Sequence, residues 1–320
     1  MKSLVNNSVD PHFNLAFDEW CLEHWEGEPV FYLWRNRPSV IIGLNQNAYS
    51  EVNLGWLRDN GVDLARRVTG GGAVYHDLQN LNYTFVGKGV TPQPFADALR
   101  KLGVPAEVSG RNDIFVGGRK VSGYARRVWH DREIVHGTLM YDVDIDSLVN
   151  ALAVPGSKLM SKGIASVRSR VTNLKPMLPS FGSLDEVQSA LAEILGGGDE
   201  VIMPDEAFLE GVRRLADGKF RTWDWVYGHS READFSRSAV LPCGTVSVQT
   251  CTDHGLITGV VFTGDFIGDL PPEGVSEVLK GVRLGYGPVL EALGTVDVGS
   301  FFYRTGPEEI ARLVVPEGIL

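Results

Sequence analysis

The sequence predicts an α+β protein of two domains, and three observations support this class. The chain has 320 residues, a length typical of two domains. Apolar residues make up 43% of it, which is enough for a sizeable core. Short strand-like segments are interspersed with segments of helical period, and the composition becomes polar over residues 228–240. We therefore predict a larger domain over residues 1–237 and a small α+β domain over residues 238–320.

The first domain is predicted to begin with a helix and to continue with mixed elements. Asp10 and Pro11 match the N-cap and first position of a helix, and apolar residues then recur at helical spacing up to His24. An Asn36-Arg37-Pro38 turn separates two predicted strands. The predicted strands of this domain are residues 31–34, 39–43, 64–67, 82–86, 113–116, 119–122 and 134–142. The further predicted helices are residues 51–60, 94–103, 144–153 and 184–195.

Residues 113–122 are predicted to form a β-hairpin with a two-residue turn at Gly117-Gly118. This turn fixes the register, and directly paired residues point to the same face. The register places four side chains on one face: Asp113, Phe115, Lys120 and Ser122. The opposite face is apolar and carries Ile114, Val116 and Val121. Lys120 is thus predicted to lie diagonally near the carboxylate of Asp113, which would hold its ammonium group.

The second domain is predicted to contain two strands followed by three helices. The strands, residues 244–250 and 255–262, flank a turn at Asp253-His254-Gly255. The helices are residues 274–283, 287–293 and 307–314. Between the first domain's last strand and this region, residues 156–173 are irregular, basic and glycine-containing, so we predict a long functional loop there.

The stretch from Arg66 to Asp77, RRVTGGGAVYHD, contains three consecutive glycines after two arginines. Glycine in ordered structure is entropically costly, so the run indicates a need for bare backbone. It matches neither G-x-x-x-x-G-K-[ST] nor a G-x-G-x-x-G that opens a helix. Bare backbone lets N–H groups converge on an anion, and strand alternation would put only one of Arg66 and Arg67 on that face. On the residues alone, a glycine-rich turn with solvated arginines is an equally good interpretation.

Charge, cysteine content and hydropathy exclude several classes. The net charge of −10 disfavours nonspecific nucleic-acid binding. No apolar run reaches transmembrane length, and the N-terminus lacks the features of a signal peptide. The three cysteines, Cys21, Cys243 and Cys251, lack metal-type spacing. We therefore predict a cytoplasmic, thiol-reduced protein without nucleic-acid or membrane partners.

Four segments resemble, in order, the successive signatures of the lipoate–protein ligases within the biotin/lipoate ligase family: RRVTGGGAVYHDLQNLNYTF, SGRNDIFVGGRKVSGYA, VHGTLMYDVDIDSLVNAL and SKGIASVRSRVTNL. The resemblance extends from Phe13 through the C-terminal domain. It implies an α/β sandwich-like catalytic domain with mixed, largely antiparallel sheets, as in class II biotin/lipoate ligases, plus a small C-terminal α+β domain. Gln79 departs from the family's usual glycine, and we expect its side chain to reshape the turn before Asn80.

The resemblance implies an ATP-dependent ligase. Such an enzyme converts lipoate and ATP to lipoyl-AMP and pyrophosphate, then transfers the lipoyl group to a lysine of an acceptor domain. The implied acceptors are lipoyl domains of 2-oxoacid dehydrogenase E2 subunits or the glycine-cleavage H protein. ATP and Mg²⁺ are the implied co-substrates, with no permanently bound cofactor. The C-terminal domain is expected to assist activation and to move between the half-reactions.

The resemblance also assigns roles to individual residues. Lys120 is the expected catalytic residue, which bridges the lipoate carboxylate and the α-phosphate. The expected ATP-binding residues are Arg67, Gly72, Ala73, Val74, Tyr75, Asn112, Asp113 and Lys120. The expected lipoate-binding residues are Trp34, Arg66, Gly71, His76, Lys120 and Gly123. Asp113 is a candidate metal ligand.

Several of these residues have an equally good structural interpretation. His76 fits a hydrogen-bonded structural histidine as well as a lipoate contact, and Trp34 fits core packing as well as a wall of the lipoyl tunnel. Lys162, Arg168 and Arg170 lie on the predicted basic loop. They are expected to close over the adenylate or to meet an acidic acceptor domain, and a merely solvated loop is the competing interpretation.

Three other functions fit parts of the sequence. The first is an octanoyl or lipoyl transferase of the same fold, either cysteine-independent or cysteine-dependent. The cysteine-dependent form works through a thioester and needs a thiol at the site, and no cysteine lies between Lys120 and Asn173. A biotin ligase shares the implied fold, but the RKVSG and RSRVTNL segments resemble the lipoate enzymes. A noncatalytic lipoyl-binding protein has little need for Lys120, Arg67 and a glycine loop together. We therefore favour the ligase.

Overall fold

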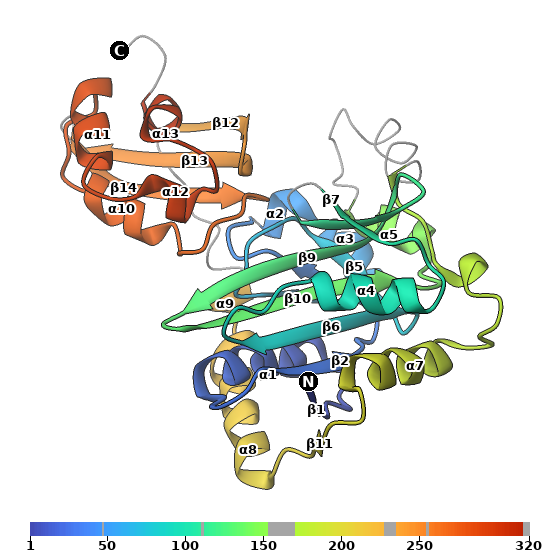
Figure 1. The fold of residues 1–320 in the computed structure, drawn as a ribbon. Helices are drawn as coiled ribbons and strands as arrows, with labels where there is room; N and C mark the ends of the chain where they lie inside the picture. The colour runs from blue at the N-terminus through green and yellow to red at the C-terminus, as the bar shows by residue number, and fades with distance from the viewer. Residues whose placement is uncertain (47, 110–111, 153–169, 227–234, 254–255, 316–320) are drawn as a thin grey trace. The chain divides into compact units, whose positions relative to one another are not determined.

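The computed structural model describes residues 1–46, 48–109, 112–152, 170–226, 235–253 and 256–315 (Figure 1). The chain divides into two compact units. The first comprises Met1–Ile42, Tyr49–Val68 and Ala73–Val226, and the second comprises Gly43–Ala48, Thr69–Gly72 and Tyr227–Leu320. The second unit thus includes two short segments from the N-terminal part of the sequence, and the domain boundary at residue 238 stays a prediction.

An eight-stranded sheet forms the centre of the first unit, in the order β11-β1-β2-β6-β10-β9-β8-β7. The strand β1 pairs in parallel with β2 and β11, and the other pairs are antiparallel. This arrangement confirms the predicted mixed, largely antiparallel sheet. The strands are β1 Lys2–Leu4, β2 Val30–Trp34, β6 Asn80–Gly87, β7 Glu107–Ser109, β8 Asp113–Val116, β9 Arg119–Trp129, β10 Arg132–Met140 and β11 Val201–Ile202.

A second sheet of three strands has the order β4-β3-β5. Its strands are β3 Ser39–Ile42, β4 Asp63–Arg66 and β5 Val74–His76. Because β3 and β4 are parallel, the chain must cross over between them, and the short helices α2 Ala48–Glu51 and α3 Leu54–Asp59 form this connection. The crossover leads into β4, and Arg67 and the glycine run follow the last residue of that strand.

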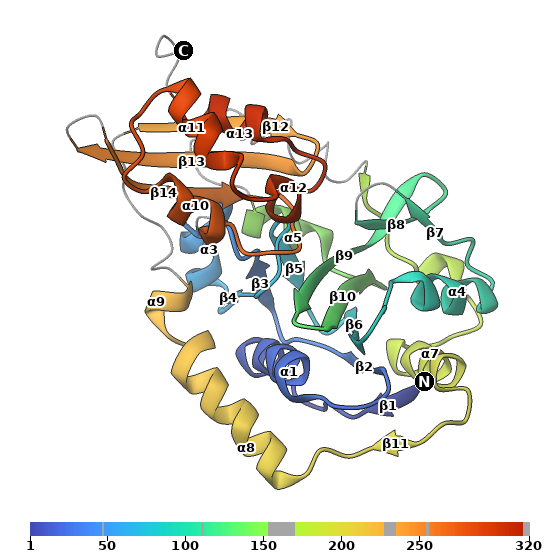
Figure 2. The same cartoon turned by 60° about the vertical axis from the view of Figure 1, so that its left-hand side comes forward.

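Helices cover both faces of the large sheet. The helices α4 Gln93–Lys101 and α7 Leu184–Gly196 pack on one face, where the rings of Tyr83 and Phe95 stack 3.8 Å apart. The helix α1 Pro11–His24 packs on the other face, and Figure 2 shows α1 and α4 on opposite sides of the strands. The first unit also contains α5 Ile145–Leu152, the 3₁₀ helix η1 Lys175–Met177, α8 Glu206–Leu215, the π-helix η2 Ala216–Phe220 and α9 Trp223–Val226.

The helix α1 begins as predicted and buries polar side chains. The Asp10 carboxylate accepts the His12 N–H at 3.0 Å, which confirms the N-cap. The buried Asp18 carboxylate accepts from the Tyr32 hydroxyl at 2.5 Å and the Thr84 hydroxyl at 3.0 Å. Its other oxygen lies 2.6 Å from His136 Nδ1. These bonds satisfy a carboxylate that burial alone would make very costly.

The predicted hairpin of β8 and β9 is present, with Gly117 and Gly118 in positive-φ conformations at its turn. Phe115 opposes Lys120, as predicted. An irregularity between Ile114 and Phe115 then shifts the register, so that Ile114 opposes Ser122. Ser122 is 1% exposed and its hydroxyl lies 3.5 Å from that of Tyr83 in the core. The prediction that Ser122 shares the face of Lys120 is therefore wrong.

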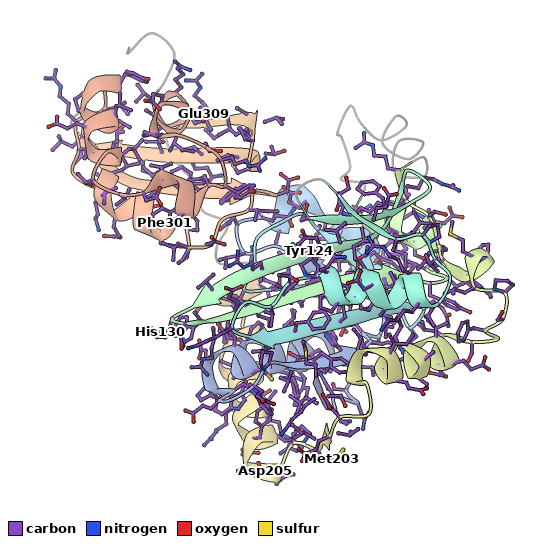
Figure 3. The ribbon with its side chains drawn as sticks, in the orientation of Figure 1. Tyr124, His130, Met203, Asp205, Phe301 and Glu309 are labelled. Carbon is purple, nitrogen blue, oxygen red and sulfur yellow. The ribbon has the colours of Figure 1, made fainter. Side chains whose placement is uncertain are left out.

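The hairpin of β9 and β10 turns at His130 and Asp131. His130, labelled in Figure 3, has a positive φ of 55°, a conformation that is uncommon for a residue with a Cβ atom. The long pairing along β9 and β10 carries Ala125 opposite His136. This register places the buried His136 in the middle of the sheet.

The second unit contains an antiparallel sheet of β12 Phe235–Leu241, β13 Gly244–Asp253 and β14 Leu256–Gly264. Among the described residues, four helices follow: α10 Glu273–Leu279, α11 Tyr286–Leu293, α12 Val298–Phe301 and α13 Pro307–Val314. They pack on the sheet around Val246, Phe262 and Leu279. The predicted small α+β domain is confirmed as an architecture. The strand β12 and the helix α12 were not predicted.

Candidate active site

Lys120 lies on β9 beside a carboxylate and over a bare backbone position. Its Nζ is 2.6 Å from Asp113 Oδ1, at angles outside those of a hydrogen bond. A Cβ atom at Gly123 would lie only 2.9 Å from this nitrogen. Glycine at this position therefore leaves the volume that the ammonium group occupies, and the predicted proximity of Lys120 and Asp113 is confirmed.

Backbone contacts hold this part of the hairpin in place. Asn112 Nδ2 donates to the carbonyl of Tyr124 at 3.1 Å, and the Tyr124 N–H donates to the carbonyl of Asn112 at 2.9 Å. The Thr172 N–H donates to the Lys120 carbonyl at 3.0 Å. Of the cations predicted on the basic loop, Arg170 is exposed, whereas Lys162 and Arg168 lie outside the described residues.

Arg67 follows β4 and is 7% exposed. Its Nη1 donates to the carbonyl of Ile41 at 3.1 Å, and its N–H donates to that of Ile42 at 3.0 Å. Burial, followed by the positive charge of Arg66, lowers the pKa of Arg67 to about 10. The guanidinium therefore stays protonated at neutral pH, and the protein holds a buried cation directly before the glycine run.

Arg66 takes a different direction, as the alternation along a strand requires. Its Nε donates to the carbonyl of Trp225 at 2.9 Å and its Nη2 to that of Val226 at 2.7 Å. The side chain is fully buried. Its guanidinium bonds the backbone of α9, and the predicted lipoate contact of Arg66 stays a prediction.

His76 provides a buried hydrogen-bond donor. The amide nitrogen of Asn36 lies 3.0 Å from His76 Nδ1, and the amide oxygen of Asn36 accepts from Asn14 at 2.8 Å. This network makes Nδ1 the acceptor and leaves the proton on Nε2. The Nε2 atom is buried without a hydrogen-bond partner. Burial, followed by the charge of Arg67, lowers the pKa of His76 to about 3, so the ring is neutral.

A polar row on β6 was missed by the sequence analysis. Asn80, Asn82 and Thr84 alternate along this strand and are all buried. Asn82 opposes Trp34, whose indole Nε1 donates to the Thr84 hydroxyl at 2.9 Å. The Asn82 amide nitrogen is buried without a partner. The signal was present in the sequence, because a strand buried on both faces seldom carries polar residues at every second position.

Two positions of the glycine run require glycine because of the backbone conformation or a close contact within the second unit. Gly71 has a positive φ of 97°, and its N–H donates to the carbonyl of Phe266 at 3.2 Å. A Cβ atom at Gly70 would lie 2.5 Å from the same carbonyl oxygen. Gly72 is less restricted, since its Cβ would make an ordinary contact of 3.6 Å with Asp265. Phosphate binding by the amides from Gly72 through Ala73 and Val74 to Tyr75 stays a prediction.

Gln79 fits its turn without strain. The described residues with positive φ, apart from glycines, are His130 and Arg304, so Gln79 does not need the conformational freedom of glycine. Its side chain is exposed, its N–H donates to the Asp77 carboxylate at 2.8 Å, and its carbonyl accepts from Tyr141 at 3.2 Å. The exposed side chain leaves these turn contacts intact.

The described residues contain neither a metal-binding cluster nor a membrane-spanning helix. No group of three or more histidine, cysteine, aspartate or glutamate side chains is arranged there to hold a metal ion. Within the same part of the chain, no helix combines the length and apolar character needed to cross a bilayer. The role of Asp113 as a metal ligand stays a prediction.

Family models match both parts of the chain. The model described as "Lipoyl protein ligase A/B catalytic domain" matches residues 10–196. The model described as "Bacterial lipoate protein ligase C-terminus" matches residues 230–314. The first match includes Arg67, His76 and Lys120, and the second covers most of the second unit.

Similar proteins cover nearly the whole chain. The lipoate–protein ligase LplJ of Bacillus subtilis is 36% identical, over 96% of this chain and 98% of that protein. Lipoate–protein ligase 1 of Staphylococcus aureus is also 36% identical, over 98% of this chain and 100% of that protein.

Solved structures show a similar fold. A bipartite lipoate protein ligase of Thermoplasma acidophilum, described with its E2 lipoyl domain, has a TM-score of 0.66 and 30% identity, over 73% of this chain and 98% of that chain. A lipoate–protein ligase A bound with ATP has a TM-score of 0.61 and 29% identity, over 71% of this chain and 98% of that chain. With a catalytic-domain match over residues 10–196 and relatives aligned almost end to end, this chain belongs to the lipoate–protein ligase family.

Proposed function

We propose that this protein is an ATP-dependent lipoate–protein ligase that forms lipoyl-AMP and transfers the lipoyl group to a lysine of an acceptor domain. The observation that carries the proposal is the Lys120 ammonium, held beside Asp113 and over the bare backbone of Gly123. The family membership gives this lysine its chemical context. Similar proteins are named for the same ligation, and one of them is described with ATP bound.

The first half-reaction has to bring two anions together, and the charges of the site suit that task. The lipoate carboxylate must approach the α-phosphate of ATP, so cations must lower their mutual repulsion. Lys120 supplies one cation and the buried Arg67 supplies a second. In the proposed mechanism Lys120 bridges a carboxylate oxygen of lipoate and an oxygen of the α-phosphate. It then stabilises the charge that develops on the acyl oxygen during transfer.

The buried donor of His76 supports a role at the carboxylate. Its neutral ring presents Nε2–H without a partner, and a carboxylate oxygen is a good acceptor for such a donor. We propose that His76 contacts lipoate together with Gly71 and Gly123, and that Trp34 walls the lipoyl chain. Asn82, with its unpartnered amide nitrogen opposite Trp34, suits the same wall.

For the nucleotide we propose the backbone from Gly72 through Ala73 and Val74 to Tyr75, with Arg67, Asn112 and Asp113. Mg²⁺ accompanies ATP as a co-substrate in this proposal, with Asp113 as its candidate ligand, and no cofactor is permanently bound. The proposed acceptors are lipoyl domains of 2-oxoacid dehydrogenase E2 subunits or the glycine-cleavage H protein. The similar Thermoplasma protein, described with an E2 lipoyl domain, supports the first class. A cytoplasmic location stays a prediction.

The test is an omission experiment with an acceptor. The protein is incubated with ATP, Mg²⁺, lipoate and an apo lipoyl domain, and the acceptor's intact mass is measured. We expect the mass of one lipoyl group to be added with the complete mixture and not when ATP, Mg²⁺ or lipoate is omitted. Transfer from a lipoylated or octanoylated carrier without ATP would show the transferase alternative instead. Preferential activation of biotin over lipoate would show the biotin ligase alternative.

A further inference from the structure

Arg66 and Trp225 bond each other's backbone in both directions. The Arg66 guanidinium donates to the carbonyls of Trp225 and Val226, at 2.9 and 2.7 Å. In return, the Trp225 indole Nε1 donates to the Arg66 carbonyl at 2.8 Å. Two of these three hydrogen bonds join residues 159 positions apart in sequence, and the third joins residues 160 positions apart. Arg66 is the largest fully buried side chain of the described residues. Its bond to Val226 is buried, and the two bonds with Trp225 are partly buried.

A second layer fixes the ring of Trp225. Lys219 Nζ lies 4.2 Å from the centre of the Trp225 ring, within range of a cation–π contact. The same ammonium donates to both oxygens of the buried Glu19, at 2.7 and 2.6 Å. The Thr222 hydroxyl accepts the Trp225 N–H at 3.2 Å. Lys219 of η2 therefore contacts the indole, Glu19 of α1 holds that lysine, and Thr222 fixes the backbone of Trp225.

These contacts converge on the residues around Arg67. The carbonyl of Arg66 is bonded by Trp225, and the carbonyl of Val68 accepts from Arg127 Nη1 at 3.3 Å. The N–H of Arg67 itself donates to Ile42 at 3.0 Å. Three consecutive residues are thus fixed through their backbones. The side chain in the middle is the buried guanidinium that directly precedes the glycine run.

We propose that Arg66 and Trp225 are positioning residues that hold Arg67 in the geometry required for ATP. We call this pair, together with Lys219 and Glu19, the arginine clamp. The inference rests on the proposed function, in which Arg67 serves the nucleotide. Its physical basis is pre-organisation. Ordering a mobile backbone on binding costs free energy and weakens ATP affinity, and a backbone that is already fixed avoids this cost. Lipoate affinity should depend much less on the clamp.

The closing experiment uses Trp225→Phe, which removes the indole N–H and keeps an aromatic ring for Lys219. Loss of this bond should raise the KM for ATP by roughly three- to tenfold, and leave the KM for lipoate within about twofold. Arg66→Lys removes the planar fork that reaches two carbonyls and should give the same selective effect. The matched control is Trp56→Phe on α3, outside the clamp, which should leave both constants unchanged.

Hydrogen exchange of the free protein gives a readout that needs no activity. Backbone amides in a peptide spanning residues 66–75 should exchange faster in Trp225→Phe than in wild type, and not in Trp56→Phe. Unchanged exchange in Trp225→Phe overturns the clamp. Normal KM values in folded Trp225→Phe and Arg66→Lys, or equal increases for ATP and lipoate, also overturn it. If wild type itself forms no lipoyl-AMP, the proposed function fails, and the exchange data still decide whether the clamp exists.

Discussion

Lys120→Ala separates catalysis from stability most clearly. Lys120 places its ammonium group over Gly123, so its removal deletes a pre-organised electrostatic contact to the reacting groups in the proposed mechanism. Losses of one such contact lower kcat by about 10²–10³, or roughly 2.7–4 kcal/mol of transition-state stabilisation. The ion pair with Asp113 is only partly buried, since the two side chains are 34% and 25% exposed. Such a pair contributes no more than about 1 kcal/mol to folding.

The two magnitudes lead to a specific assay. Pyrophosphate release with lipoate and ATP should fall at least about 100-fold in Lys120→Ala, while the free energy of unfolding in urea should fall by no more than about 1 kcal/mol. Lys101→Ala is the control, because Lys101 is an exposed lysine on α4. Activity within about tenfold of wild type, in a folded variant, would refute the assignment of Lys120. A loss of activity that only follows unfolding would refute the argument from geometry.

The remaining predictions concern Arg67, Gly137 and His76. Arg67→Ala should raise the KM for ATP more than the KM for lipoate, and equal increases in steady-state assays would count against its role with the nucleotide. Gly137→Ala should lower the free energy of unfolding in urea by about 1–3 kcal/mol, because its Cβ would lie 2.4 Å from the Tyr83 hydroxyl; Gly259→Ala, with open space around it, should change little. The folded pKa of His76 is lowered from 6.5 to about 3, so the unfolded state binds more protons between these values. The contribution of His76 to stability is therefore complete above pH 6.5 and declines as the pH falls. Between pH 7 and 5, wild type should lose about 2 kcal/mol more than His76→Gln in urea unfolding, and parallel pH profiles would contradict this.

Much of the fold followed from short-range chemistry. The N-cap at Asp10 and the two-residue turn at Gly117-Gly118 are local signals, and both are present in the structure. Most of the predicted strands of both units are also present. They were predictable because alternating or continuous apolar residues indicate a strand buried on one face or on both. The pair of Lys120 and Asp113 was predictable for the same reason, since the turn sets which residues are neighbours.

Other features depend on contacts that no local pattern contains. Alternation indicates that Arg66 and Arg67 point apart, but it does not indicate what either side chain contacts. The partner of Arg66 is the backbone of α9, 159 residues later. The shifted register between Ile114 and Phe115 depends on how β8 and β9 fit the rest of the sheet. The strand β12 lies at the edge of its sheet, and its apolar residue Val240 is 84% exposed. Because an apolar residue occupies an exposed position, the sequence of β12 shows only a weak alternation of polar and apolar residues. The network of Asp18 likewise joins elements far apart along the chain.

The buried polar face of α1 has a consequence for the order in which this protein folds. Asp18 needs His136, 118 positions later, and Glu19 needs Lys219, 200 positions later. At a synthesis rate of about 5–20 residues per second, Glu19 is incorporated roughly 10–40 s before Lys219. The first helix of the chain is therefore among the last to reach its native surroundings, and the nascent N-terminus has to remain hydrated until almost the whole first unit has been made.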